Sequence, residues 1–314
     1  MSTLVTGGAG YIGRHVVRAL LARGERVAVV DLPGGSVRDD RVAFLGLDLA
    51  DTGAVEPLTE FLRRNGVASV IHLAARKRVD ESVARPAWYF QQNVGGLVTV
   101  LLAAEAAGVR RIVFSSTAAV YASSPRAVTE DDLLEPSNPY GHSKLAGEKL
   151  VDAHAEATGG AAISLRYFNV AGSEEPALAE AEPHNLIPLV VRAIRDGRPP
   201  VIYGDDYDTI DGTCVRDYVH VSDIAAAHLA ALDALDSASG HRVYNVGTGD
   251  GASVREVVGR LLELAGSGIV PRVEPRREGD PAIVVADATR LRTDLGWSPA
   301  HDLGDILRSA WAAR

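Results

Sequence analysis

The N-terminal stretch Thr3-Leu4-Val5-Thr6-Gly7-Gly8-Ala9-Gly10-Tyr11-Ile12-Gly13 decides the fold. Residues 2–6 are predicted to form a short buried strand and residues 11–23 a helix, with a glycine-rich turn between them. Gly8, Gly10 and Gly13 match G-x-G-x-x-G, and Gly7, Gly10 and Gly13 also satisfy G-x-x-G-x-x-G. Such glycines let the backbone turn tightly and approach a pyrophosphate, whose charge is favoured at a helix N-terminus. The stretch therefore predicts a dinucleotide-binding unit.

A second predicted strand, residues 26–31, ends at Asp31. An acid about twenty residues beyond the glycines is placed to bind the adenosine ribose hydroxyls of a dinucleotide. Its carboxylate would repel a 2′-phosphate, so the sequence favours NAD over NADP. Strand, glycines, helix, strand and acid occur in the expected order, which argues against a coincidental glycine-rich turn.

Strand-length apolar runs alternate with helical patterns along the first half of the chain. Strands are predicted at 2–6, 26–31, 42–47, 68–73, 110–115 and 162–167, and helices at 11–23, 52–65, 87–107 and 140–158. This alternation predicts an α/β fold with a Rossmann-type, doubly wound parallel sheet.

The alternation breaks after Asn169. Residues 172–220 are expected to be irregular except for a helix near 185–196, and the later predictions are helices 222–236, 253–265, 287–295 and 302–313 with a strand at 243–246. We therefore expect an NAD-binding domain at 1–168, to which segments near 220–246 return, and a smaller, mainly substrate-binding domain at 169–314. The cleft between them is the expected substrate site.

Composition excludes several classes of partner. A net charge of −9 and a pI near 5.5 argue against nucleic acid and anionic membranes. Cys214 is the only cysteine, so no intramolecular disulfide or cysteine-based zinc site is expected, and no metal site is predicted. The cysteine usage and the lack of a long apolar run fit a cytoplasmic protein.

Tyr140 and Lys144 are four residues apart in a predicted helix and so share one face. A neighbouring ammonium is expected to lower the pKa of the phenol and make it a usable general base. Thr117 ends the predicted strand nearby, where ligands bind in parallel sheets, and its hydroxyl is a candidate for a bond to substrate. A helix cap or strand-end turn is the alternative role for Thr117.

With these motifs in place, the chain resembles an extended short-chain dehydrogenase/reductase, most closely the UDP-galactose 4-epimerase (UDP-glucose 4-epimerase) family. The resemblance covers essentially the whole chain. It includes Val70-Ile71-His72-Leu73-Ala74-Ala75, Pro139 to Lys144, Leu165 to Asn169, His184 to Pro188, Asp211 to His220 and Pro275 to Asp280. The last three blocks are the more specific, because they match the nucleotide-sugar pocket of epimerases.

The resemblance implies a reaction in which Tyr140 takes the proton of the sugar 4-hydroxyl while NAD accepts the C4 hydride. Lys144 would lower the pKa of Tyr140 and bind the nicotinamide ribose, and Thr117 would orient the 4-oxygen. A 4-keto sugar would then turn over in the pocket and take the hydride back on its other face.

The resemblance also implies the binding residues. The cofactor-contacting positions are Gly7, Gly10, Tyr11, Ile12, Gly13, Asp31, Asp48, Leu49, Lys77, Asn93, Ser115, Tyr140, Lys144 and Tyr167. The UDP-sugar positions are Thr117, Asn169, Asn185, Leu186, Arg216, Arg277, Asp280 and Val284. Other roles stay open for four of them: a helix N-cap for Asp48, a surface position for Lys77, and ordinary ion pairs with Asp217 or Glu278 for Arg216 and Arg277.

Val284 aligns with a gate beside the sugar C2 substituent, although an offset of one residue would select Ile283. Valine leaves room there, so UDP-GlcNAc and UDP-GalNAc become additional candidate substrates. UDP-glucuronate is an alternative epimerase substrate. Dehydratases and decarboxylases need further carboxylates after the threonine, where this chain has Ala118-Ala119. A nucleotide-sensing protein without turnover is disfavoured, since Tyr140 and Lys144 are both present.

Helices 87–107 and 140–158 are partly apolar on their outer faces. In related proteins the equivalent helices form a dimeric four-helix bundle, so the resemblance implies a homodimer.

Overall fold

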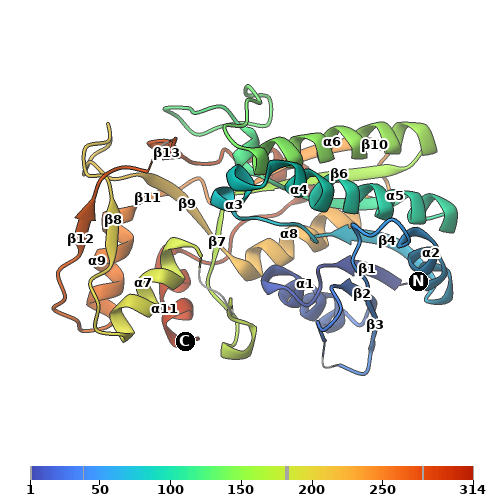
Figure 1. The fold of residues 1–314 in the computed structure, drawn as a ribbon, viewed down its shortest axis with the longest axis horizontal. Helices are drawn as coiled ribbons and strands as arrows, with labels where there is room; N and C mark the ends of the chain where they lie inside the picture. The colour runs from blue at the N-terminus through green and yellow to red at the C-terminus, as the bar shows by residue number, and fades with distance from the viewer. Residues whose placement is uncertain (1, 38, 181–183, 278, 314) are drawn as a thin grey trace.

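The computed structural model describes residues 2–37, 39–180, 184–277 and 279–313. Within them, seven parallel strands form a central sheet in the order β10-β6-β5-β4-β1-β2-β3 (Figure 1). The strands are β1 (Ser2–Thr6), β2 (Arg26–Asp31), β3 (Val42–Gly46), β4 (Val67–His72), β5 (Arg111–Thr117), β6 (Ala161–Tyr167) and β10 (Gly240–Val246). The predicted doubly wound parallel sheet is confirmed.

Helices cover both faces of this sheet, because successive strand residues point to opposite sides. Val5 and Val29 pack in one cluster with α1 (Tyr11–Ala22) and α8 (Val221–Ala234). Their neighbours Leu4 and Val30 pack in another with α2 (Val55–Arg64) and α5 (Gly96–Ala107). The helix α6 (Pro139–Thr158) packs beside α5 over β5 and β6.

The helix predicted at 87–107 begins slightly earlier than predicted and is not α-helical throughout. It begins as α4 (Pro86–Phe90), continues through a π-helical turn η1 (Gln91–Gly95) and ends as α5, after a separate short helix α3 (Val79–Ala84). Proline is well suited to the first turn of a helix, which explains the start at Pro86.

The prediction that residues 172–220 are irregular outside one helix is wrong. They contain β8 (Val201–Tyr203) and β9 (Val215–His220) in addition to a 3₁₀ turn η3 (Pro176–Leu178) and α7 (Leu186–Arg195). The strand β9 pairs with β7 (Asn169–Ala171), β11 (Gly251–Ser253) and β13 (Ile283–Val284), and β8 pairs with β12 (Arg272–Glu274). Apart from β9, these strands have only two or three residues, which is too short to show the alternating pattern that predicts a strand.

These small sheets lie with α7, α9 (Val254–Leu264) and α11 (Leu303–Ala312) at one end of the molecule, while α10 (Thr289–Leu295) packs against β10 (Figure 1). The residues Ile187, Val191, Val257, Leu261 and Ile306 form their shared core. In the part of the chain that the structure describes, no helix has the length and apolar character needed to cross a membrane.

Candidate active site

The glycine-rich turn is built so that side chains cannot enter it. Gly7 has a φ of 69°, and a Cβ there would lie 2.8 Å from the backbone nitrogen of Ala74. A Cβ on Gly13 would lie 2.1 Å from the carbonyl oxygen of Gly7. Because Gly10 before α1 has no side chain to cap the helix, the first N–H groups of α1 remain suited to an anion. Tyr11 and Ile12 begin that helix, as predicted.

Asp31 ends β2 beside this turn. Its Oδ2 accepts a hydrogen bond from the Ala9 N–H at 2.8 Å, and its Oδ1 accepts one from the Leu32 N–H at 2.8 Å. Asp48 follows β3 and accepts a hydrogen bond from the Ala50 N–H at 2.9 Å. The alternative role of Asp48 as a helix N-cap is wrong, since α2 begins only at Val55.

Tyr140 lies next to Thr117 because α6 packs closely against the end of β5. Asn138 caps α6 by accepting a hydrogen bond from the Gly141 N–H at 3.0 Å. A Cβ on Gly141 would lie 2.3 Å from the carbonyl oxygen of Ala119, so glycine lets the first turn of α6 press on the 3₁₀ turn η2 (Ala118–Val120). Thr117 also caps η2, accepting a hydrogen bond from Ala119.

Burial dominates the protonation of the Tyr140 and Lys144 pair. Desolvation raises the pKa of Tyr140, and a hydrogen bond with Thr117 opposes this shift. Desolvation also lowers the pKa of Lys144 to about 7, opposed by the nearby Glu148 carboxylate. The expected lowering of the Tyr140 pKa by Lys144 is therefore not what the structure shows. The physical reason is that a dry site disfavours phenolate and ammonium alike.

The Lys144 ammonium donates a hydrogen bond to the Ser115 carbonyl at 2.8 Å and lies 5.0 Å from the Phe114 ring centre. Ser115 hydrogen bonds to Tyr167, whose hydroxyl contacts His228 Nε2. Burial raises the pKa of Tyr167, and the charge of Tyr140 adds to this shift. The predicted residues Ser115, Tyr140, Lys144 and Tyr167 are thus gathered at the ends of β5 and β6.

Two other predicted cofactor residues lie in the loop system after β4. The Asn93 side chain is buried and bridges Arg76 and Ser143, accepting from the Arg76 N–H at 2.7 Å and donating to Ser143 Oγ at 2.9 Å. Asn93 therefore fixes this loop against α6. The Lys77 ammonium forms an ion pair with Glu180. Leu49 is buried against the start of α5, near Gly96.

The predicted UDP-sugar residues lie on the smaller sheets and on α7. Asn169 begins β7, and Asn185 and Leu186 begin α7, with Asn185 exposed. Arg216 of β9 forms an ion pair with Asp280 at 2.6 Å rather than with Asp217, so the alternative pairing is wrong. The alternative partner of Arg277, Glu278, lies outside the described residues.

An aromatic residue that the sequence analysis did not select adjoins this group. The Arg277 guanidinium carbon lies 4.0 Å from the ring centre of Tyr203, at the end of β8. Tyr203 is 39% exposed. Its position after a three-residue strand carries little signal, although an exposed aromatic beside arginines is typical of a binding surface.

Val284 is associated with both groups of candidate residues: those at the end of β5 and on α6, and those on the smaller sheets. It pairs with Arg216 in the register of β13 and β9. Its side chain packs in an apolar cluster with Ala118 and Leu145, the residues that follow Thr117 and Lys144. Ile283 is not among the members of that cluster.

Two buried carboxylates were also missed by the sequence analysis. Glu148, one turn after Lys144 on α6, accepts hydrogen bonds from Arg166 of β6 at 2.9 and 2.6 Å. Asp217 of β9 accepts bonds from the N–H groups of Thr248, Gly249 and Ala286 at 2.9–3.1 Å. The Tyr-x-x-x-Lys-x-x-x-Glu spacing was a usable signal for Glu148, whereas the partners of Asp217 are distant in sequence.

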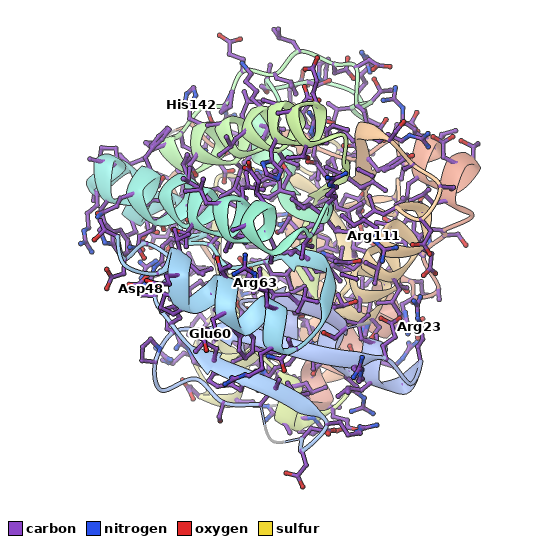
Figure 2. All side chains as sticks on the ribbon, turned by 90° about the vertical axis from the view of Figure 1, so that its right-hand side faces the viewer. Arg23, Asp48, Glu60, Arg63, Arg111 and His142 are labelled. Carbon is purple, nitrogen blue, oxygen red and sulfur yellow. The ribbon has the colours of Figure 1, made fainter. Side chains whose placement is uncertain are left out.

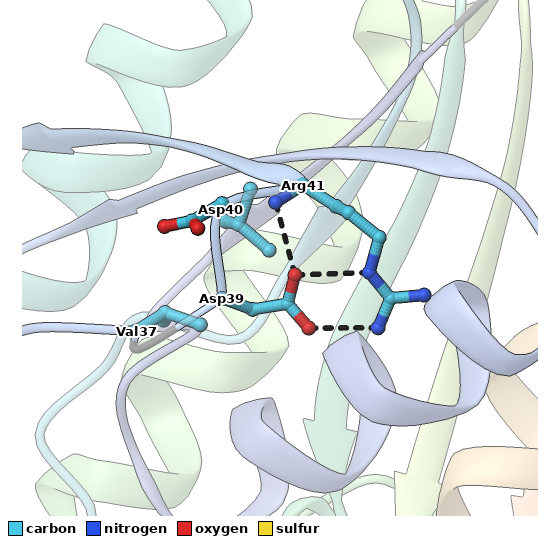
Figure 3. A pocket seen from close by; sticks show the side chains of 5 residues that line it. Val37, Asp39, Asp40 and Arg41 are labelled. Atoms are coloured by element: carbon cyan, nitrogen blue, oxygen red, sulfur yellow. Dashed lines mark hydrogen bonds and ion pairs between the residues drawn. The ribbon is translucent and has the colours of Figure 1, made fainter.

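A recess before β3 does not belong to this site. It measures about 930 Å³ and is lined by Val37, Asp39, Asp40, Arg41 and Val42 (Figure 3). Asp39 within it is paired with Arg41. β3 forms the edge of the sheet away from β5 and β6, so the recess is remote from the catalytic pair.

Comparison with known proteins gives a consistent family. Residues 3–247 match the model of the NAD dependent epimerase/dehydratase family. The UDP-glucose 4-epimerase of Azospirillum brasilense is 44% identical to the chain over 314 residues, covering 98% of this chain and 90% of that protein.

Solved structures agree with the sequence comparison. A Stenotrophomonas maltophila UDP-glucose 4-epimerase with bound NAD and formylated UDP-arabinopyranose has a TM-score of 0.93 at 36% identity, covering 99% of this chain and 97% of that one. A Bifidobacterium longum UDP-glucose 4-epimerase in complex with NAD+ and UDP has a TM-score of 0.91 at 36% identity, covering 100% and 98%.

The chain belongs to the NAD dependent epimerase/dehydratase family, an extended short-chain dehydrogenase/reductase class. The sequence identities and the nearly complete coverage assign the chain to a narrower family within this class. Within it, the chain belongs to the UDP-glucose 4-epimerase family, which confirms the predicted family and favours it over the glucuronate alternative.

Proposed function

We propose that this chain is an NAD-dependent isomerase that interconverts UDP-glucose and UDP-galactose. One observation carries the proposal: Tyr140, hydrogen-bonded to Thr117, begins the helix that buries Lys144 one turn later, at the carboxyl end of β5. Membership of the family supports the same conclusion.

The residues present fit NAD. Gly7 and Gly13 allow the tight turn that a pyrophosphate-binding loop needs, because a Cβ on either would collide with backbone atoms. Asp31, at the end of β2, suits the adenosine ribose, and Asp48 and Leu49 follow β3 on the adenine side. Lys77, Tyr167 and Lys144 surround the remainder of the site.

Tyr140 is the group that exchanges the proton of the sugar 4-hydroxyl. Thr117 hydrogen bonds to Tyr140 and so holds the 4-oxygen within reach of the phenol. Lys144 lies one turn after Tyr140 on α6, and its low pKa limits the charge that the dry site must hold. NAD, when bound, supplies the hydride acceptor and donor for C4. After the 4-keto sugar turns over, Tyr140 returns the proton.

The UDP moiety binds on the smaller sheets. Arg216 and Arg277 suit the diphosphate, because guanidinium groups bind phosphate through paired hydrogen bonds. Asp280, now paired with Arg216, suits the uridine ribose. Asn169, Asn185 and Leu186 complete the proposed contacts. On this basis residues 1–168 form the NAD domain, joined by α8 and β10, and residues 169–314 mainly the UDP-sugar domain.

Val284 serves as the gate beside the sugar C2 substituent. Val284 and Ala118, which follows Thr117, pack against the same apolar cluster, and this supports Val284 over Ile283 for the role. Since valine is smaller than an aromatic gate, we extend the substrate range to UDP-GlcNAc and UDP-GalNAc. A cytoplasmic location stays a prediction from the single cysteine.

The test is to incubate the purified protein with UDP-galactose without added NAD and to quantify UDP-glucose. Tyr140→Phe should abolish conversion while bound NAD, measured after denaturation, stays at the wild-type content. Failure of the wild-type protein with UDP-hexoses, UDP-N-acetylhexosamines and UDP-glucuronate alike would sink the epimerase proposal. A Tyr140→Phe protein with retained activity would reject Tyr140 as the base.

We also propose that two copies of the chain pair through the helices predicted at 87–107 and 140–158, which are α4 to α5 and α6 in the structure, with α3 beside them. The exposed apolar side chains on these helices are Val79, Val83, Phe90, Val98 and Leu102. Val98 and Leu102 are one turn apart on α5, which runs beside α6, and His142 marks the outer surface of α6 (Figure 2). Exposed apolar side chains on neighbouring helices suit an isologous dimer.

Light scattering after size-exclusion chromatography should give the mass of a dimer. Leu102→Glu should shift the protein to monomer, because it buries a charge at the proposed interface. The matched control is Leu264→Glu, at a leucine of α9 with a similar exposure of 40% against 48%. A monomeric wild type, or a dimer unaffected by Leu102→Glu, would refute this interface.

A further inference from the structure

Residues 172–180, here called the strap, lie along α1, the helix that follows the glycine-rich turn (Figure 1). The Tyr11 hydroxyl donates a hydrogen bond to the Gly172 carbonyl at 2.6 Å. The Arg14 guanidinium donates to the carbonyls of Ala177 at 2.9 Å and Ala179 at 3.1 Å. The strap backbone is therefore bound by side chains of α1.

Two more residues of α1 make similar contacts. Nε2 of His15 accepts a hydrogen bond from the Glu174 N–H at 3.4 Å. Arg18 forms ion pairs with Glu174 at 3.2 Å and Glu175 at 2.5 Å. Positions 11, 14, 15 and 18 follow the i, i+3, i+4, i+7 spacing, so one whole face of α1 is occupied by the strap.

The two ends of the strap tie it to both binding regions. It begins directly after β7, the strand that starts with Asn169, and a Cβ on Gly172 would lie 2.5 Å from His220, so its starting path is fixed. At its other end, Glu180 pairs with the Lys77 ammonium. Lys77 follows β4, whose end contacts the glycine-rich turn through Ala74 and Gly7.

The contacts form a closed ring that begins and ends at the glycine-rich turn. It runs from the turn to Tyr11, along the strap to Glu180, across to Lys77, and back through Ala74 to Gly7. Most of the ring consists of the covalent backbone or of hydrogen bonds and ion pairs between the strap and α1. The Glu180–Lys77 ion pair links the end of the strap to the segment after β4, with Glu180 11% and Lys77 50% exposed.

We infer that the strap retains the dinucleotide, and that Glu180 is a positioning residue that holds Lys77 over the cofactor turn. This inference rests on the proposed use of NAD. Breaking the Glu180–Lys77 pair removes the contact between the end of the strap and the segment after β4. The contacts between the strap and α1 remain. Glu180 therefore influences the rate at which NAD is released, and it does not influence the chemical step.

The experiment measures the release of NAD from the purified holoenzyme. Each variant is diluted into buffer with an NAD-trapping dehydrogenase, and the NAD still bound to protein is quantified over time. Glu180→Gln should release NAD roughly two- to fivefold faster than wild type, the range expected for losing a partly exposed ion pair. Glu180→Lys should release it faster still, since it places two cations together.

The matched control is Glu256→Gln, which breaks a partly exposed pair with Arg260 on α9. Its release rate should equal that of wild type. Added NAD should restore the activity that Glu180→Gln loses on dilution. Wild-type release rates in both Glu180 variants would overturn the inference, as would a loss of turnover that excess NAD does not restore. A wild-type chain that binds NAD but epimerises no UDP-sugar would refute the proposed function alone.

Discussion

Glu148 and Arg166 form a buried ion pair whose disruption should be among the most costly single changes in the chain. Their side chains are 5% and 3% exposed, and the carboxylate meets the guanidinium at 2.9 and 2.6 Å. Ser116 also donates to the carboxylate, and Arg166 donates to the Tyr121 hydroxyl at 2.8 Å. In the described part of the chain, the hydrogen bonds to these two charges come from each other and from neutral groups, and Lys144 is also near the Glu148 carboxylate.

Glu148→Gln leaves the Arg166 charge unpaired and turns an amide N–H₂ toward a guanidinium donor. Removing one partner of a buried pair costs about 3–5 kcal/mol, or roughly a hundred- to several-thousand-fold in the unfolding equilibrium constant. The free energy of unfolding in excess NAD, measured by urea denaturation, should fall by that amount. Glu256→Gln, which breaks an exposed pair, should cost about 1 kcal/mol or less.

A double substitution separates the charge effect from packing. Glu148→Met with Arg166→Met replaces both charges by apolar side chains of similar length, so its cost should be smaller than that of Glu148→Gln alone. If Glu148→Gln loses no more stability than Glu256→Gln, the buried pair is not the constraint that its geometry indicates. A double variant less stable than Glu148→Gln would show that shape, not charge, dominates.

Three further changes test the site. Because the folded state lowers the pKa of Lys144 from 10.5 to about 7, the unfolded chain holds the extra proton between these values. The free energy of unfolding of ligand-free wild type should therefore rise with pH in that window by about 1.4 kcal/mol per unit relative to Lys144→Met, and parallel curves would contradict this. Gly13→Ala places a Cβ 2.1 Å from a backbone oxygen and should abolish NAD retention, whereas Gly259→Ala, with open space around its Cβ, should retain the wild-type content. Val284→Tyr should lower kcat/KM for UDP-GlcNAc about tenfold or more relative to UDP-galactose, because overpacking costs 1–3 kcal/mol, and an unchanged ratio would point to another gate.

Much of the central sheet could be predicted because its strands are buried on both faces. Val27 to Val30 and Val70 to Ile71 are continuous apolar runs, and such runs between helical patterns are typical of parallel sheets. The small sheets could not be predicted in this way. β9 contains Arg216 and the fully buried Asp217, whose charge is satisfied by N–H groups from distant loops, so its pattern resembles an irregular segment.

The candidate site was predictable where spacing along one element decides geometry. Tyr140 and Lys144 needed only the helical repeat, and Gly7 to Gly13 only the demands of a tight turn. The Lys77–Glu180 pair and the Arg277–Tyr203 contact join residues from separate elements, and their meeting depends on tertiary structure. The same holds for the protonation of Tyr140, where burial raises the pKa more than the hydrogen bond with Thr117 lowers it.

The environment of Tyr140 and Lys144 therefore extends further along α6 than their four-residue spacing implies. Lys144 lies one turn after Tyr140 and Glu148 one turn after Lys144. Glu148 opposes the desolvation that lowers the pKa of Lys144, and Arg166 of β6 holds Glu148 in place. Because Arg166 directly precedes Tyr167, one strand supports both Lys144, through Glu148, and the Tyr167 contact with Ser115. Burial and the Thr117 hydrogen bond thus set the direction of the Tyr140 pKa shift, while Glu148 acts on the pKa of Lys144.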